Sequence, residues 1–185
     1  MAPVPPGERR TVALVSSAAG QVGIVGYACY SPTKFALRGF AEALAMEMGA
    51  HRVDVTVAYP PDTDTPGYAA EMEEGKPEEC TLISGEMGLY SAEQVGRDIV
   101  DAACQGRTSV YWGLEGWMLA TLTAGMGPGP GPGVSLRNFL ELGGQLLLMG
   151  ILRAVSLVYL WSFQKIVDKC HRKRMQLQQQ QEKQT

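Results

Sequence analysis

Thr11–Ser17 (TVALVSS), the helical pattern over Tyr30–Met48 and Val53–Tyr59 (VDVTVAY) together specify the fold class of this 185-residue chain. The first run is short, apolar and rich in β-branched residues, which predicts a strand buried on both faces of a parallel sheet. The second run alternates valine with other residues and ends at two prolines, which also predicts a strand. Strand, helix and strand in this order predict a βαβ unit and an α/β fold.

The segments around this unit have different characters. Ser91–Cys104 has apolar residues on one helical face and opens with a Ser91/Gln94 pair that resembles a capping box. Gly125–Gly133 alternates glycine and proline; because proline has no N–H to donate to a phosphate, we interpret it as a linker. Met1–Arg10 has no apolar core of a secretory signal, and we expect a disordered leader there.

An apolar stretch near the C-terminus, Leu146–Phe163, predicts membrane association. Apolar residues fill 14 of its 18 positions, and as a helix it spans roughly 27 Å, just under a hydrocarbon core of about 30 Å. Arg153 near its middle costs about 3 kcal/mol on insertion, so spanning, re-entrant and interfacial placements all stay open, as does burial within protein. The basic residues that follow suit anionic head groups on a cytosolic face: Lys165, Lys169, Arg172, Lys173 and Arg174.

Composition excludes several function classes. The chain is 45% hydrophobic and 19% charged, so it can bury a core, and its net charge of −3 argues against a general nucleic-acid binder. Its four cysteines form no CxxC pair and its two histidines are far apart in sequence. We therefore expect no zinc site, no disulfide framework and reduced thiols in the cytosol.

Three residues could carry redox chemistry on a carbonyl group. Tyr30 and Lys34, at i and i+4, project from one helical face. A phenol has a pKa near 10, and an ammonium one turn away favours its ionised form, so Tyr30 could give a proton to a carbonyl oxygen as hydride moves. Ser17, at a strand's carboxyl end, would hold the same oxygen, with adjacent Ser16 as the alternative since neighbouring strand side chains face opposite ways. The alternative is a surface lysine packed beside a half-buried tyrosine without a catalytic role.

The motifs VSSAAG, YSPTK 13 residues after Ser17 and a strand ending in proline resemble the short-chain dehydrogenase/reductase superfamily. Within it, YPPDTDTPG at Tyr59–Gly67 and YSPTKFALRGFAEALAME resemble the 3-ketodihydrosphingosine reductase family, over about Thr11 to Arg174. The resemblance implies the C-terminal half of a doubly wound Rossmann-like sheet with an apolar helical extension. It also implies NADPH-dependent reduction of 3-ketodihydrosphingosine to dihydrosphingosine in sphingolipid biosynthesis, at the cytosolic face of the endoplasmic reticulum membrane.

The resemblance also implies residue roles. Ser17 would orient the ketone, and Tyr30 would be the acid/base and also contact the cofactor. Lys34 would stabilise the phenolate and bind the nicotinamide ribose. Pro60 and Thr65 match the turn that contacts the nicotinamide carboxamide, although proline at the next position replaces the superfamily's usual glycine. The polar segment 68–88 would be the substrate lid or, equally, a solvated loop.

One departure limits these expectations. The superfamily's TGxxxGxG turn and Asn-Asn-Ala-Gly strand end do not occur in this sequence. We therefore expect a partial dehydrogenase domain over 11–124, a linker over 125–133 and a membrane-associated segment over 134–185, with the chain inactive alone. The alternatives are a non-catalytic membrane-associated fragment and a reductase of another lipid or steroid ketone. A homo-oligomer stays open.

Overall fold

The computed structural model describes residues 8–125 and 136–182 and contains the expected βαβ unit. Strand β1 (Arg10–Val15), helix α1 (Tyr30–Gly49) and strand β2 (Val53–Ala58) follow in order, and the two strands pair in parallel with Val12 opposite Val55. A short strand, β5 (Ser109–Val110), pairs in parallel with the other edge of β2, giving the order β1-β2-β5. The α/β fold class is confirmed.

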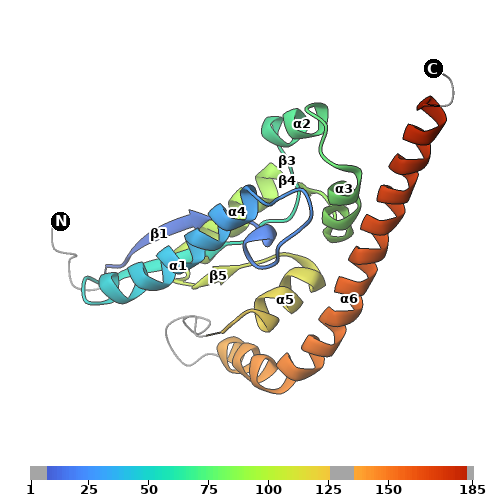
Figure 1. The fold of residues 1–185 in the computed structure, drawn as a ribbon. Helices are drawn as coiled ribbons and strands as arrows, with labels where there is room; N and C mark the ends of the chain where they lie inside the picture. Colours follow the sequence, from blue (N-terminus) through green and yellow to red (C-terminus); the bar gives the residue numbers. More distant parts are fainter. Residues whose placement is uncertain (1–7, 126–135, 183–185) are drawn as a thin grey trace.

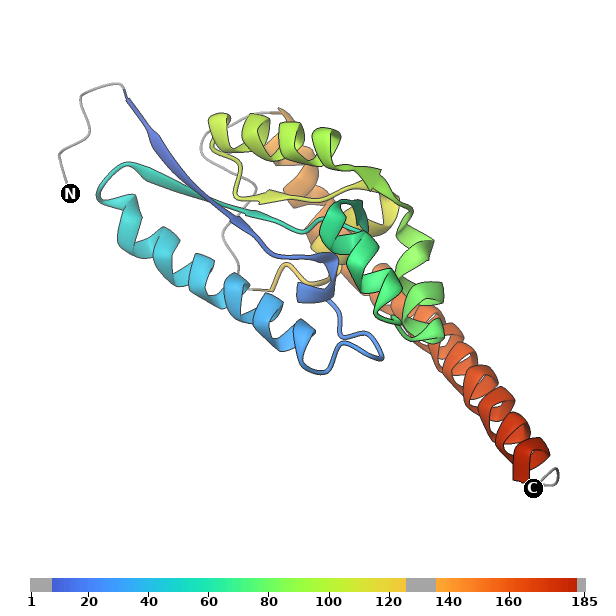
Figure 2. The same cartoon turned by 90° about the horizontal axis from the view of Figure 1, so that it is seen from above.

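Two helices cover opposite faces of this sheet (Figures 1 and 2). Helix α1 packs on one face, where Ala41 meets Val55 and Val57 of β2. Helix α4 (Ala92–Cys104) packs on the other face, where Val95 and Ala102 meet Ala58. Because alternate side chains of a strand point to opposite faces, β2 contributes to both layers of the core.

Strand β1 differs from its prediction in burial and in length. It lies at the edge of the sheet in the described part of the chain, and Val15 is 51% exposed, so the predicted burial on both faces is wrong; the strand that is buried on both faces is β2. The strand also ends at Val15, leaving the two serines in the turn that follows. The predicted disordered leader is wrong for its last two residues, because Arg10 begins β1 and Arg9 forms an ion pair with Asp54 at 2.7 Å. Residues 1–7 lie outside the described residues.

The segment 68–88 is helical, so the solvated-loop alternative is wrong. Helix α2 (Pro66–Glu73), helix α3 (Glu78–Ser84) and a 3-10 turn, η2 (Gly85–Met87), follow one another, with Cys80 and Ile83 buried. The strands β3 (Thr63–Asp64) and β4 (Tyr90–Ser91), which flank these helices in sequence, pair in parallel. Ser91 caps α4 as predicted, its Oγ accepting from the Gln94 N–H at 3.2 Å.

The C-terminal part is a single long helix, α6 (Leu136–Glu182), that packs against helix α5 (Gly113–Leu122) and α3 (Figure 1). Sequence reasoning predicted the apolar stretch of α6 but neither α5 nor β5. By length and composition α6 can cross a membrane, and only 6% of its most apolar window is buried. Residues 126–135, which contain most of the predicted linker, lie outside the described residues.

Candidate functional site

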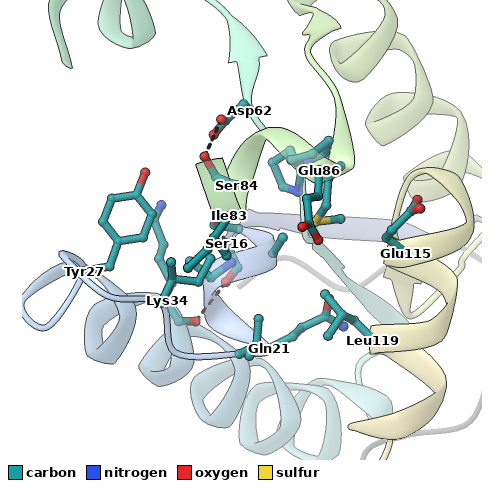
Figure 3. A pocket seen from close by; sticks show the side chains of 18 of the residues that line it. Ser16, Gln21, Tyr27, Lys34, Asp62, Ile83, Ser84, Glu86, Glu115 and Leu119 are labelled. Atoms are coloured by element: carbon teal, nitrogen blue, oxygen red, sulfur yellow. Dashed lines mark hydrogen bonds between the residues drawn. The ribbon is translucent and has the colours of Figure 1, made fainter. Parts of the chain in front are cut away.

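A cavity of about 830 Å³ opens at the carboxyl ends of β1 and β2 (Figure 3). Its walls come from the 3-10 turn η1 (Ala18–Gly20), the start of α1, the α2–α3 unit, α5 and α6. The structure brings together in this cavity all the residues that the sequence singled out: Ser16, Ser17, Tyr30, Lys34, Pro60 and Thr65. Segments more than forty residues apart in sequence therefore share one pocket.

Tyr30 and Lys34 lie on one face of α1, as their spacing predicts. The Lys34 Nζ is 5.3 Å from the centroid of the Tyr30 ring and donates a long hydrogen bond, 3.4 Å, to the carbonyl oxygen of Val15. Tyr30 is 41% exposed and lines the cavity. An ammonium held beside a phenol stabilises negative charge on the phenol oxygen.

The two serines have different partners. Ser16 is 2% exposed, and its Oγ donates to the carbonyl oxygen of Lys34 at 2.8 Å, which ties the end of β1 to α1. Ser17 is half-buried and caps η1, its Oγ accepting from the Ala19 N–H at 3.2 Å. Because that contact uses a lone pair, the Ser17 hydrogen can still be donated to a ligand oxygen.

The turn after β2 is fixed by its own hydrogen bonds. The carbonyl oxygen of Pro60 accepts from the Ala18 N–H at 3.0 Å, which joins this turn to η1. The Thr65 Oγ1 accepts from the Tyr68 N–H at 3.1 Å and so caps α2. Pro61 has no N–H to offer, so this turn presents one backbone donor fewer than a glycine would.

Sequence reasoning missed a buried lysine that contacts two residues of the cavity wall, Asp62 and Glu71. The Lys76 side chain is 1% exposed, with its Nζ 3.4 Å from Asp62 and 3.7 Å from Glu71. The same Nζ lies 5.5 Å from the ring centroid of Tyr27, whose hydroxyl donates to Glu71 at 2.8 Å and whose pKa is raised by burial. The sequence EEGKPEE indicates a solvated lysine, so no local signal marks this cluster.

Comparison with known proteins shows which family this chain belongs to. The profile described as short chain dehydrogenase matches residues 7–76. The chain is 47% identical over 165 residues to 3-dehydrosphinganine reductase of Danio rerio, covering 88% of this chain and 47% of that protein. It is 46% identical over 173 residues to 3-ketodihydrosphingosine reductase of Bos taurus, covering 92% of this chain and 50% of that protein. The chain belongs to the short-chain dehydrogenase family.

Membership confirms the resemblance that the motifs VSSAAG and YSPTK indicate. The short-chain dehydrogenase family implies a nicotinamide dinucleotide, NAD or NADP, as cofactor. The chain spans about half the length of the relatives that it matches.

Helix α6 forms the apolar wall of this short-chain dehydrogenase cavity. Its inward residues belong to the stretch that predicts membrane association: Leu152, Val155, Tyr159, Leu160 and Phe163. Arg153 also lines the cavity and donates to the Ser156 Oγ at 3.5 Å, so this charge is not surrounded by hydrocarbon on every side. The sequence could not reveal this wall, because α6 meets the cavity only through contacts between distant segments.

Proposed function

We propose that this cavity is the active site for NADPH-dependent reduction of 3-ketodihydrosphingosine to dihydrosphingosine. The observation that carries the proposal is the meeting of Ser17, Tyr30 and Lys34 in a cavity whose opposite wall is apolar. The serine, tyrosine and lysine suit a ketone, and the apolar wall suits an alkyl chain. The relatives named 3-dehydrosphinganine reductase and 3-ketodihydrosphingosine reductase support this substrate class.

The residues at the start of α1 fit the nicotinamide end of the cofactor. Lys34 has one long hydrogen bond, to Val15, and its ammonium group has further protons for ribose hydroxyls. Pro60 and Thr65 lie in the same cavity and would contact the carboxamide. When bound, NADPH supplies the hydride.

The protein's own groups would act on the ketone oxygen. The Ser17 hydroxyl donates to this oxygen and polarises the carbonyl group. Tyr30 transfers its phenolic proton to the same oxygen, which becomes the product hydroxyl. The positive charge of Lys34 stabilises the phenolate that remains, and solvent then restores the proton.

The exposed face of α6 supports a location at a membrane. Apolar side chains on that face are open to solvent, among them Leu147 (79% exposed) and Ile151 (62%), while the other face lines the cavity. A long-chain substrate could therefore pass from lipid into the cavity along α6. We propose the cytosolic face of the endoplasmic reticulum membrane, as the family resemblance implies.

The test is NADPH consumption in the presence of 3-ketodihydrosphingosine, with the 185-residue chain in detergent micelles. Tyr30→Phe should lower turnover by about 100-fold or more, because the acid is lost. Tyr111→Phe removes a hydroxyl that bonds Glu141 outside this cavity, and it should leave turnover unchanged. Equal rates for wild type and Tyr30→Phe would contradict the proposal. A panel of lipid and steroid ketones separates this substrate from those of other reductases.

A second candidate function is that of a non-catalytic, membrane-associated partner. It is favoured by the missing TGxxxGxG turn and by the outer edge of β1, which has no strand partner among the described residues. Equilibrium titration with NADPH separates the two functions. Saturable binding in the micromolar range by this polypeptide alone contradicts the second candidate, and the absence of binding favours it.

A further inference from the structure

Tyr30 lies at a helix end that has no side-chain cap. It is the first residue of α1, and among the described residues no side chain at Cys29 makes a capping hydrogen bond. Helix ends without such a bond open more easily than capped ends. Thr33 supports only the backbone here, its Oγ1 donating to the Tyr30 carbonyl oxygen at 2.7 Å. The orientation of the Tyr30 ring therefore depends on its neighbours in space.

Two side chains contact the Tyr30 ring. One is Lys34, on the next turn of α1, and the other is Tyr27, whose ring centroid lies 5.0 Å from that of Tyr30 at an interplanar angle of 51°. Tilted aromatic pairs at this separation attract each other. The carbonyl oxygen of Tyr27 also accepts from the Ser31 N–H at 2.8 Å. Tyr27 therefore supports the start of α1 with its ring and with its backbone.

Lys76 holds Tyr27 from the junction of α2 and α3. Its Nζ lies 5.5 Å from the centroid of the Tyr27 ring, and a cation over a ring in a site without water is attracted to it. The Tyr27 hydroxyl donates to Glu71, and the same carboxylate is 3.7 Å from the Lys76 Nζ. The Lys76 side chain is 1% exposed and lies behind the residues that line the cavity. Lys76 can therefore act on the cavity only through its neighbours.

The turn that leads into α1 also packs closely against α3. Gly26 has a φ of 88°, and a Cβ there would lie 3.1 Å from the Pro77 side chain. Asp62, which contacts the Lys76 Nζ, also accepts from the Ser84 Oγ at 2.7 Å (Figure 3). The α2–α3 unit, the turn before α1 and the turn after β2 therefore meet around one buried ammonium group.

We propose that Lys76 is a positioning residue for the reduction: through the Tyr27 ring it keeps the Tyr30 phenol in the orientation that gives a proton to the ketone oxygen. This inference rests on the proposed function, in which Tyr30 is the acid. Because an acid must lie within hydrogen-bond reach of its acceptor, a displaced Tyr30 ring lowers turnover even where the ketone still binds. The alternative is that Lys76 only stabilises the α2–α3 unit.

The first measurement is steady-state turnover of 3-ketodihydrosphingosine with NADPH by the full chain in detergent micelles. Rates are expressed per folded molecule, with the folded fraction taken from circular dichroism at the assay temperature. Lys76→Met should lower kcat about tenfold and leave KM for the ketone within about twofold, because Lys76 does not line the cavity. Val110→Ala removes buried contacts in the core beneath α4 and is the matched control for lost stability. It should change neither constant.

A double-variant cycle tests whether Lys76 acts through the Tyr27 ring. Tyr27→Leu should lower kcat by itself, and adding Lys76→Met to it should lower kcat no further, because the ring that Lys76 holds is already gone. Independent losses that multiply in the double variant would overturn the inference, and so would a kcat of Lys76→Met equal to that of wild type.

Nitration of Tyr30 by tetranitromethane, localised by mass spectrometry, reports the packing of the phenol without cofactor or turnover. Lys76→Met and Tyr27→Leu should each raise the nitration rate about fivefold, which corresponds to the loss of one aromatic pair. Val110→Ala should not change it, and an unchanged rate in Lys76→Met would overturn the inference. Faster nitration in both variants of a chain without turnover contradicts only the proposed reaction. Turnover by wild type with equal nitration in all variants contradicts only the positioning by Lys76.

Discussion

Replacing Gly20 by alanine tests the close contact that joins η1 to α1 beneath the proposed site. An added Cβ would lie 2.9 Å from the carbonyl oxygen of Lys34 and closer still to the Ser16 Oγ. The Lys34 carbonyl belongs to the backbone of α1 and cannot rotate away, so η1 or α1 must shift. Overpacking of this kind costs about 1–3 kcal/mol, against a gain of about 0.4–1 kcal/mol from the stiffer unfolded chain. The expected net loss is about 1–2 kcal/mol.

The assay is urea unfolding followed by circular dichroism in detergent, with Gly39→Ala as the matched control. Gly39 lies within α1, and a Cβ there would meet no heavy atom within 4 Å, so alanine should raise the free energy of unfolding by about 1 kcal/mol. The double variant Ser16→Ala/Gly20→Ala should be more stable than additivity predicts, because one of the two close contacts is gone. If Gly20→Ala is as stable as Gly39→Ala, the close approach of η1 to α1 is wrong.

Three further predictions concern the site and its supports. Ser16→Ala should lower the free energy of unfolding by about 1 kcal/mol in urea and largely spare turnover, whereas Ser17→Ala should lower turnover by about 100-fold. The hydrogen bond from a guanidinium on α6 lowers the pKa of Glu79. This hydrogen bond therefore stabilises the junction of α3 and α6 fully at neutral pH, and hydrogen exchange there should rise as the pH falls below the ordinary glutamate pKa and through the lowered one. Glu79→Gln should remove this pH dependence, and Glu78→Gln, at an exposed pair, should not. Lys76→Met should lower the free energy of unfolding by about 3 kcal/mol in urea, because two carboxylates lose their buried partner.

The contact between α3 and α6 explains why acid should act on the apolar helix. Arg174 of α6 pairs with Glu79, which is 3% exposed, and Lys173 pairs with Glu78 at 3.1 Å. Sequence analysis predicts these basic residues to face anionic lipid. In the structure two of them instead hold α6 against α3, next to the cavity, so this part of the helix is fixed by protein contacts.

The sequence by itself determined the βαβ unit and singled out the candidate site residues. The spacing of apolar residues, every second residue in a strand and every 3.6 residues in a helix, is a local property of the sequence, and it specifies β1, α1 and β2. The spacing of Tyr30 and Lys34 is also local, because one helical turn fixes their common face. The carboxyl-edge rule for parallel sheets predicts that Ser17 lies near them, and in the structure the three residues line one cavity.

Only the tertiary structure decided which serine hydroxyl donates to a backbone carbonyl, what surrounds the lysine in EEGKPEE and which helix forms the apolar wall of the cavity. Ser16 and Ser17 look alike in sequence, but Ser16 is bonded to the Lys34 carbonyl across a packing contact. Lys76 is buried by aromatic rings and carboxylates from other segments, and α6 supplies the apolar wall from more than a hundred residues beyond β1. Such features arise from contacts between distant parts of the chain, and a local pattern of residues carries no record of those contacts.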